Sequence, residues 1–88
     1  MSYHVHVSQK AKKEIRRLDR NVAFRVIEHL DKIAESPFDQ RLSSPLEMSP
    51  HRRYSRVGDW RIIYYLDEPR RPVVIAAICP RDKAYDKV

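Results

Sequence analysis

The chain has 88 residues, enough for one domain whose hydrophobic core is close to the smallest that holds a fold together. Its single cysteine, Cys79, excludes an internal disulfide and fits a reducing cytoplasm. Lysine and arginine number 18 against 12 acidic residues, and the net charge of +6 favours nucleic acid, an anionic membrane surface or an acidic protein as partner. The sequence shows no signal peptide and no apolar run of roughly 20 residues, so we expect a soluble cytoplasmic protein with no membrane partner.

The first part of the sequence predicts one strand followed by two antiparallel helices. Valines alternate with histidines over residues 3–7, which is typical of a half-buried strand. Ser8 then stands where an N-cap belongs, ahead of an amphipathic and strongly basic helix. Asn21 is predicted to cap a second helix, which ends before Pro37.

The rest of the sequence predicts a loop and then three strands. Residues 36–50 contain three prolines and no apolar period, so we interpret them as a loop. Strands are predicted at residues 51–57, 60–67 and 73–79. A tight hairpin turn at Gly58 and Asp59 joins the first two, and the glycine, the only one in the chain, is expected to supply a positive φ.

The order β-α-α-β-β-β predicts an α+β fold, with a small, mainly antiparallel sheet and both N-terminal helices packed on one of its faces. We expect a single domain over residues 1–88. The last two strands are apolar at both alternations, which is more than one covered face requires. Either a partner covers the second face, or several apolar side chains stay exposed there.

Residues 56–64 read Arg-Val-Gly-Asp-Trp-Arg-Ile-Ile-Tyr, which resembles the core signature of the RelE/ParE toxin superfamily. The tail is also similar to that family, because Arg81 precedes Tyr85 by four positions. The resemblance covers nearly the whole chain. It implies a type II toxin of the RelE-like branch, a metal-independent endoribonuclease that cleaves mRNA in the ribosomal A site and so inhibits translation. It also implies a RelB-like antitoxin, which we expect to bring an acidic, amphipathic helix.

RNA cleavage without a metal requires attack by a 2′-hydroxyl on the adjacent phosphate, assisted by a base, a phosphate-stabilising cation and an acid. Arg61 suits the second role because its guanidinium stays charged and binds phosphate bidentately; a structural pair with Asp59 is the alternative. By resemblance, Arg81 stabilises or protonates the leaving group, or else is a surface residue. Tyr85 stacks on a base or donates a proton, or else packs the C-terminal segment.

The general base is the role that the sequence leaves open. RNA-cutting members of the family carry lysines along the strand that begins here at His51, and arginine and tyrosine replace them at positions 52 and 54. Histidine titrates in the useful range, so His51 is a candidate base, with an ordinary surface residue as the alternative. The strand is otherwise predicted to hold RNA or the ribosome electrostatically. The predicted binding residues are His51, Arg52, Arg53, Tyr54 and Arg56.

No metal or other cofactor is expected, because His4 and His6 share a strand face but have no third ligand in view. Two other functions stay open at this level. One is a ParE-like toxin that inhibits DNA gyrase without chemistry of its own, and the other is a non-catalytic member that binds RNA or protein through the same basic sheet. Replacement of Arg61 and Arg81 should abolish the effect of a nuclease and spare that of a gyrase inhibitor.

Overall fold

The computed structural model describes residues 3–46, 49–67 and 72–80. In this part of the chain the elements are β1 (Val5–Val7), α1 (Gln9–Arg16), α2 (Arg20–Glu35), β2 (Ser43–Leu46), β3 (Ser49–Val57), β4 (Trp60–Leu66) and β5 (Val73–Pro80). The strands form one sheet in the order β1-β5-β4-β3-β2. β1 runs parallel to β5, and the other neighbours are antiparallel. The predicted α+β fold with a mainly antiparallel sheet is confirmed.

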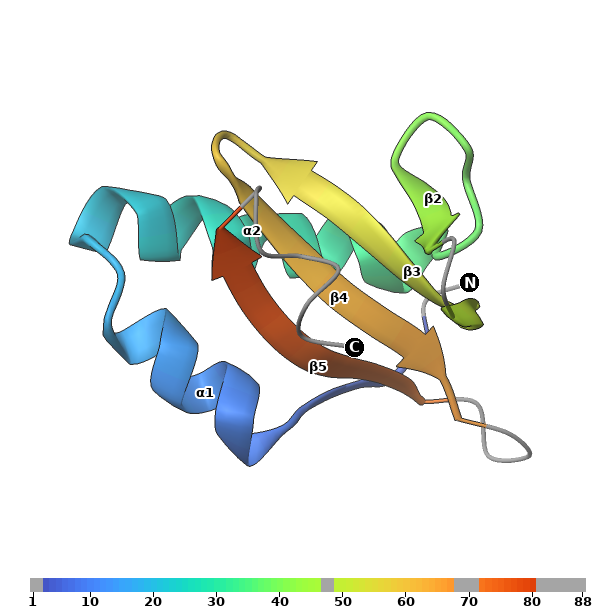
Figure 1. Ribbon diagram of the computed structural model, residues 1–88, viewed down its shortest axis with the longest axis horizontal. Coiled ribbons are helices and arrows are strands. Elements are labelled where there is room, and N and C mark those ends of the chain that lie inside the picture. The colour runs from blue at the N-terminus through green and yellow to red at the C-terminus, as the bar shows by residue number, and fades with distance from the viewer. Residues whose placement is uncertain (1–2, 47–48, 68–71, 81–88) are drawn as a thin grey trace.

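Both helices pack on one face of the sheet, which we call the helix face. Figure 1 shows α2 passing behind the strands and α1 lying beside β5. The core between these layers comprises Ala11, Val26, Leu30, Ile33, Val57, Ile62, Tyr64, Val73, Ile75 and Ile78. Each large apolar side chain buried in this way stabilises the fold by about 1.5–3 kcal/mol. Neither helix in the described part of the chain is long and apolar enough to cross a membrane.

The opposite side of the sheet, which we call the second face, carries a smaller apolar cluster. Leu46, Ile63, Ala77 and Cys79 are buried there, with Tyr54 packed against them. This cluster explains why β4 and β5 are apolar at both alternations. The alternative that these side chains stay exposed is wrong, since Ile63 and Cys79 have no exposed surface.

Two predictions about element boundaries are also wrong. Residues 36–50 are not a loop throughout, because they contain β2 and the beginning of β3. β2 lies at the edge of the sheet, where Pro45 is tolerated because one side of the strand needs no N–H donor. The second helix begins at Arg20, with Asp19 rather than Asn21 as its N-cap. Aspartate and asparagine are about equally favoured as N-caps, so residue type alone did not separate Asp19 from Asn21, and Asp19 makes no side-chain capping hydrogen bond.

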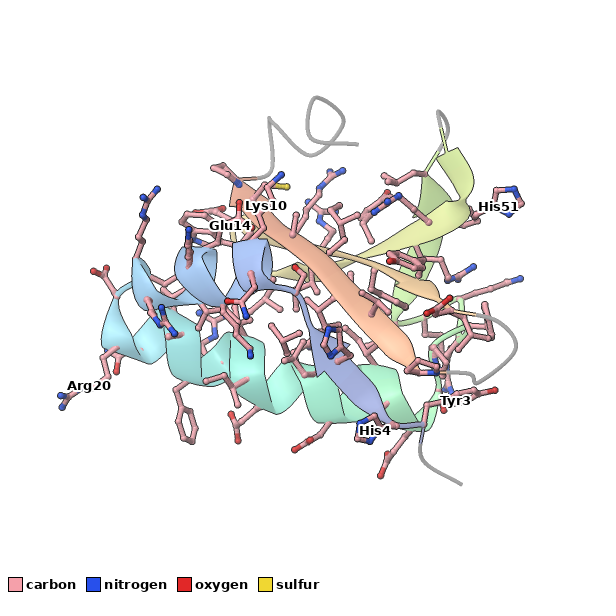
Figure 2. All side chains as sticks on the ribbon, turned by 90° about the horizontal axis from the view of Figure 1, so that it is seen from below. Tyr3, His4, Lys10, Glu14, Arg20 and His51 are labelled. Carbon is pink, nitrogen blue, oxygen red and sulfur yellow. The ribbon has the colours of Figure 1, made fainter. Side chains whose placement is uncertain are left out.

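α1 closes an edge of β5 that the short strand β1 leaves unpaired. Ser8 is the N-cap, as predicted, and its hydroxyl accepts from the Ala11 N–H while donating to the Ala76 carbonyl, both at 3.1 Å. The Glu14 carboxylate accepts from the Ile78 N–H at 2.8 Å, and Figure 2 shows this side chain beside β5. Two side chains of α1 therefore satisfy backbone groups that a longer β1 would have paired.

The turn between β3 and β4 fixes the register on which the candidate site depends. Gly58 has a φ of 58°, as predicted for the only glycine of the chain. The turn sets Val57 opposite Trp60, and the pairing continues without a shift to Arg52 opposite Tyr65. Because side chains alternate between faces, this register decides which residues of the two strands meet.

Candidate nucleic-acid interface

The second face carries a ladder of basic and aromatic side chains on β3 and β4. Three cross-strand pairs form it, in the order Arg56 with Arg61, Tyr54 with Ile63, and Arg52 with Tyr65. Tyr54 and Ile63 belong to the second-face cluster, so the pairs two positions to either side point the same way. We call these six residues the second-face ladder. It brings together four residues that the sequence predicted as site residues: Arg52, Tyr54, Arg56 and Arg61.

Two of the arginines in this ladder stack on tyrosine rings. The guanidinium of Arg61 lies over the Tyr54 ring at 4.5 Å from its centroid, and that of Arg52 lies over the Tyr65 ring at 4.8 Å. The Nε of Arg61 is inaccessible to solvent. Stacking of this kind is favourable and restricts the guanidinium, so less side-chain entropy is lost when it binds a phosphate.

The cross-strand pair at one end of the ladder consists of two positively charged residues. Arg56 and Arg61 are directly opposite on adjacent strands. Like charges at such positions repel each other and destabilise the sheet. An anion that accepts hydrogen bonds from both guanidinium groups would remove this repulsion, which makes the pair a suitable site for a phosphate group.

Arg53 lies on the helix face, away from the ladder. Its Nε donates to the Ser43 hydroxyl at 2.9 Å and its Nη2 to the Ser43 carbonyl at 3.1 Å, and its guanidinium lies 5.6 Å from the centroid of the Phe38 ring. His51 is two positions before Arg53 on β3 and is therefore on the same helix face, and both residues line a cavity of about 270 Å³. The structure thus separates Arg53 and His51 from Arg61, and the period-two alternation of the strand already contained that signal.

Ser43 also belongs to a buried hydrogen-bond network on the helix face. The Tyr64 hydroxyl donates to the Pro37 carbonyl at 2.6 Å and lies 2.7 Å from the Ser43 hydroxyl. Burial raises the pKa of Tyr64, although its contacts with Ser43 and Arg53 oppose that shift. This network fastens the segment between α2 and β2 to the core, so its role is structural.

His29 is a polar residue that the sequence reasoning missed. Its Nε2 lies 2.5 Å from the Ser55 hydroxyl, which itself donates to the Leu42 carbonyl at 2.7 Å. Since a hydroxyl has one proton to donate, we infer that the His29 Nε2–H is the donor to Ser55. Burial and, to a smaller extent, the charge of Lys32 lower the pKa of His29. The available signal in the sequence was a histidine at the border between the apolar and polar faces of α2.

Two cavities connect His29 with the edge of the ladder. One, of about 520 Å³, lies between α2 and the β3–β4 turn, and the other, of about 270 Å³, lies over β2 and β3. His29 and Arg56 line both, and Tyr54 lines the second. Arg81 and Tyr85, the remaining predicted catalytic residues, lie outside the described residues. Among the residues that the structure does describe, no three histidine, cysteine or acidic side chains are grouped so that they could hold a metal ion.

Solved structures of known toxins have the same fold. The RelBE2 toxin–antitoxin complex of Mycobacterium tuberculosis contains a chain 24% identical to this one, with a TM-score of 0.79 and coverage of 92% of this chain and 100% of that chain. The free RelE toxin of Escherichia coli, in a mutant form, is 20% identical with a TM-score of 0.82, and the match covers 99% of this chain and 94% of that chain. The RelE–RelB complex of Pyrococcus horikoshii contains a chain that is 24% identical with a TM-score of 0.77, and the match covers 96% of this chain and 100% of that chain.

A comparison with curated proteins finds no match. A family model, described as the ParE toxin of the type II toxin–antitoxin system parDE, matches residues 5–85. This match spans almost the entire chain, including both helices, the ladder and the basic tail. The chain therefore belongs to the ParE toxin family, within the RelE/ParE superfamily of type II toxin–antitoxin systems.

Proposed function

We propose that this toxin is a ribosome-dependent endoribonuclease that cleaves mRNA in the A site and thereby inhibits translation. The observation that carries the proposal is the second-face ladder, which combines an opposed arginine pair with two tyrosine–arginine stacks. Single-stranded RNA is bound by such surfaces, because guanidinium groups bind its phosphates and aromatic rings stack on its bases.

Charge stabilisation and orientation drive the cleavage. The 2′-hydroxyl of one nucleotide gives its proton to water as it attacks the adjacent phosphorus, the bond from phosphorus to the 5′-oxygen breaks, a 2′,3′-cyclic phosphate forms, and the 5′-oxygen leaves with a proton from Tyr85 or water. Arg56 and Arg61 hold the phosphoryl oxygens as negative charge builds on them. Arg81 stabilises the departing oxygen, and Tyr85 stacks on a base or supplies the proton. The reaction requires no metal or other cofactor.

The ladder positions in the described residues carry arginine, tyrosine and isoleucine, and His51 lies on the other face. We therefore assign no strong base to this surface. Removal of one charge-stabilising donor should then affect the rate more than replacement of His51.

The partners that we propose are the ribosome with its mRNA and a RelB-like antitoxin. Similar structures from Mycobacterium tuberculosis and Pyrococcus horikoshii are complexes of a toxin with its antitoxin. An antitoxin with an acidic, amphipathic helix would complement the net charge of +6.

Translation of a defined message on purified ribosomes tests the nuclease. The wild-type protein should produce new 5′ ends within the A-site codon, and Arg61→Ala should lower the cleavage rate by about 100- to 1,000-fold. Arg81→Ala should also reduce it strongly. Arg20→Ala is the matched control, because Arg20 lies at the start of α2, away from the sheet (Figure 2), and should cleave like the wild type.

The match to the ParE family model supports a second candidate, inhibition of DNA gyrase. An intact message with the wild-type protein, together with loss of supercoiling by purified gyrase, would replace the nuclease proposal with this one. In that case Arg61→Ala would still inhibit gyrase if the contact surface lies elsewhere.

A further inference from the structure

We infer that Tyr65 and Arg52 form a nucleobase-stacking subsite, placed beside the phosphate-binding arginines on the second face. The inference rests on the proposed RNA-cleaving function and adds to it a specific position for a flanking nucleotide. Tyr65 is not among the site residues that the sequence predicted.

The two residues are directly opposite on adjacent strands, and the Arg52 guanidinium lies 4.8 Å from the centroid of the Tyr65 ring. Both side chains are partly exposed, whereas Ile63, the apolar member of the ladder, is fully buried. A tyrosine in the interior of a sheet is ordinarily used for packing, but Tyr65 belongs to neither buried cluster. Its ring is instead held at the surface by a cation.

The distance to Arg61 suits a short stretch of single-stranded RNA. Tyr65 follows Arg61 by four positions on β4, and a strand rises by about 3.3–3.4 Å per residue, so the two positions are about 13 Å apart along the strand. Even a strand whose bases stay stacked at about 3.4 Å per step covers that distance in about four nucleotides. A phosphate at Arg61 and a base at Tyr65 can therefore belong to one segment of RNA.

The chemistry of the ladder favours RNA over a protein helix. An amphipathic helix requires an exposed apolar stripe, and the apolar member of this ladder is already buried. What the ladder exposes is arginine and tyrosine, at intervals of two residues on β3 and at an interval of four on β4. Every nucleobase has a flat π face, and every nucleotide adds a negative charge, so a stack of tyrosine and arginine binds both parts.

The test measures binding to purified ribosomes that carry a short message strand whose 2′-hydroxyl groups are methylated, so that attack on the phosphate is blocked. Each nucleotide in turn is replaced by an abasic sugar or by the fluorescent base 2-aminopurine. Tyr65→Leu should weaken binding roughly 5- to 150-fold, and Tyr65→Phe, which keeps the ring, should bind like the wild type. At one nucleotide position the abasic sugar should weaken binding to the wild type strongly and to Tyr65→Leu hardly at all. The 2-aminopurine at that position should be quenched only by proteins that keep the ring.

The matched control is Phe24→Leu. Phe24 is 63% exposed on α2 and does not line the cavity that Tyr65 shares with Phe38 and Arg53. This variant should bind all the strands like the wild type. An equal loss in Phe24→Leu and Tyr65→Leu would show that any exposed ring matters, and would overturn the subsite.

Failure of the subsite is distinguishable from failure of the proposed function. If abasic sugars weaken the wild type and Tyr65→Leu equally at every position while the wild type still cleaves message on ribosomes, the subsite is wrong and the nuclease proposal stands. If the wild type neither binds nor cleaves RNA, both are wrong.

Discussion

At the scale of single residues, Arg52 and Arg53 have different roles because consecutive side chains of a strand point to opposite faces of the sheet. Arg53 donates two hydrogen bonds to Ser43 and holds the connection between α2 and β2. Arg52 stacks on Tyr65 among the cationic residues of the ladder. Residue type therefore does not decide the role of a basic side chain here, whereas its position in the alternation does.

Tyr64 should be the tyrosine of β4 whose hydroxyl matters for stability. Tyr64→Phe removes two buried hydrogen bonds, to the Pro37 carbonyl and to the Ser43 hydroxyl, each of which contributes about 0.5–1.5 kcal/mol, so the free energy of unfolding should fall by about 1–3 kcal/mol. Tyr65→Phe removes a hydroxyl from a partly exposed ring and should stay within about 0.5 kcal/mol of the wild type. Urea denaturation of both variants measures the difference, and equal stabilities would contradict the role of the Tyr64 hydroxyl.

At the scale of elements, α2 is tied to the sheet by one polar contact beside its apolar face. The contact from His29 to Ser55 joins residues that are 26 positions apart and lies between the two cavities at the edge of the ladder. The folded protein favours neutral His29, because burial lowers its pKa. The attachment of the helix is therefore coupled to pH.

The stability of the protein should decrease as the pH falls below about 6.5, the ordinary pKa of histidine. In that range the unfolded chain binds a proton on His29 before the folded chain does, and the loss ends once the pH has passed the lowered pKa of the folded state. His29→Gln keeps a donor for Ser55 but does not titrate, so its melting temperature should depend less on pH. Melting curves from pH 7.5 to 5 provide the check, with the exposed His51 replaced by glutamine as control. Parallel pH curves for the wild type and His29→Gln would contradict the prediction.

The sequence predicted elements whose signals are local and missed those that depend on distant partners. The N-cap Ser8 and the turn at Gly58 mark their elements directly, and both predictions are confirmed. β2 was missed because an edge strand of four residues with a proline has no apolar alternation to detect. Arg61 was recognised through its surrounding signature, whereas Tyr65 and His29 gain their interest only from contacts across the fold.

At the scale of the whole molecule, basic side chains lie on both sides of the sheet, and the ladder differs in how it groups them. α1 exposes Lys10, Lys12, Lys13 and Arg16, whereas the ladder places three arginines beside two tyrosine rings on the second face. A net charge of +6 attracts any polyanion from a distance, and in the proposed function the ladder is the surface on which RNA binds. Affinity for RNA should therefore respond to salt through the ladder more than through the other basic residues.

The logarithm of the RNA association constant should decrease linearly with the logarithm of salt concentration. Arg52→Gln should reduce the steepness of that line by about 0.7, the contribution of one phosphate on a single strand. Arg20→Gln removes the same charge far from the ladder and should leave the slope nearly unchanged. Fluorescence anisotropy titrations at several salt concentrations measure the slopes, and equal reductions in both variants would mean that the charge acts without a defined contact surface.

The parallel pairing of β1 with β5 has a consequence for how the protein is made. Val5 pairs with Val73, and the Ser8 hydroxyl reaches the Ala76 carbonyl across 68 positions of sequence. At about 5–20 residues per second, synthesis of that stretch takes roughly 3–14 s. The helices and the β3–β4 hairpin rest on shorter contacts and can form earlier during this time. β1 is thus synthesised before the other strands and is among the last of them to be paired, because its pairing requires that the chain has been made through β5.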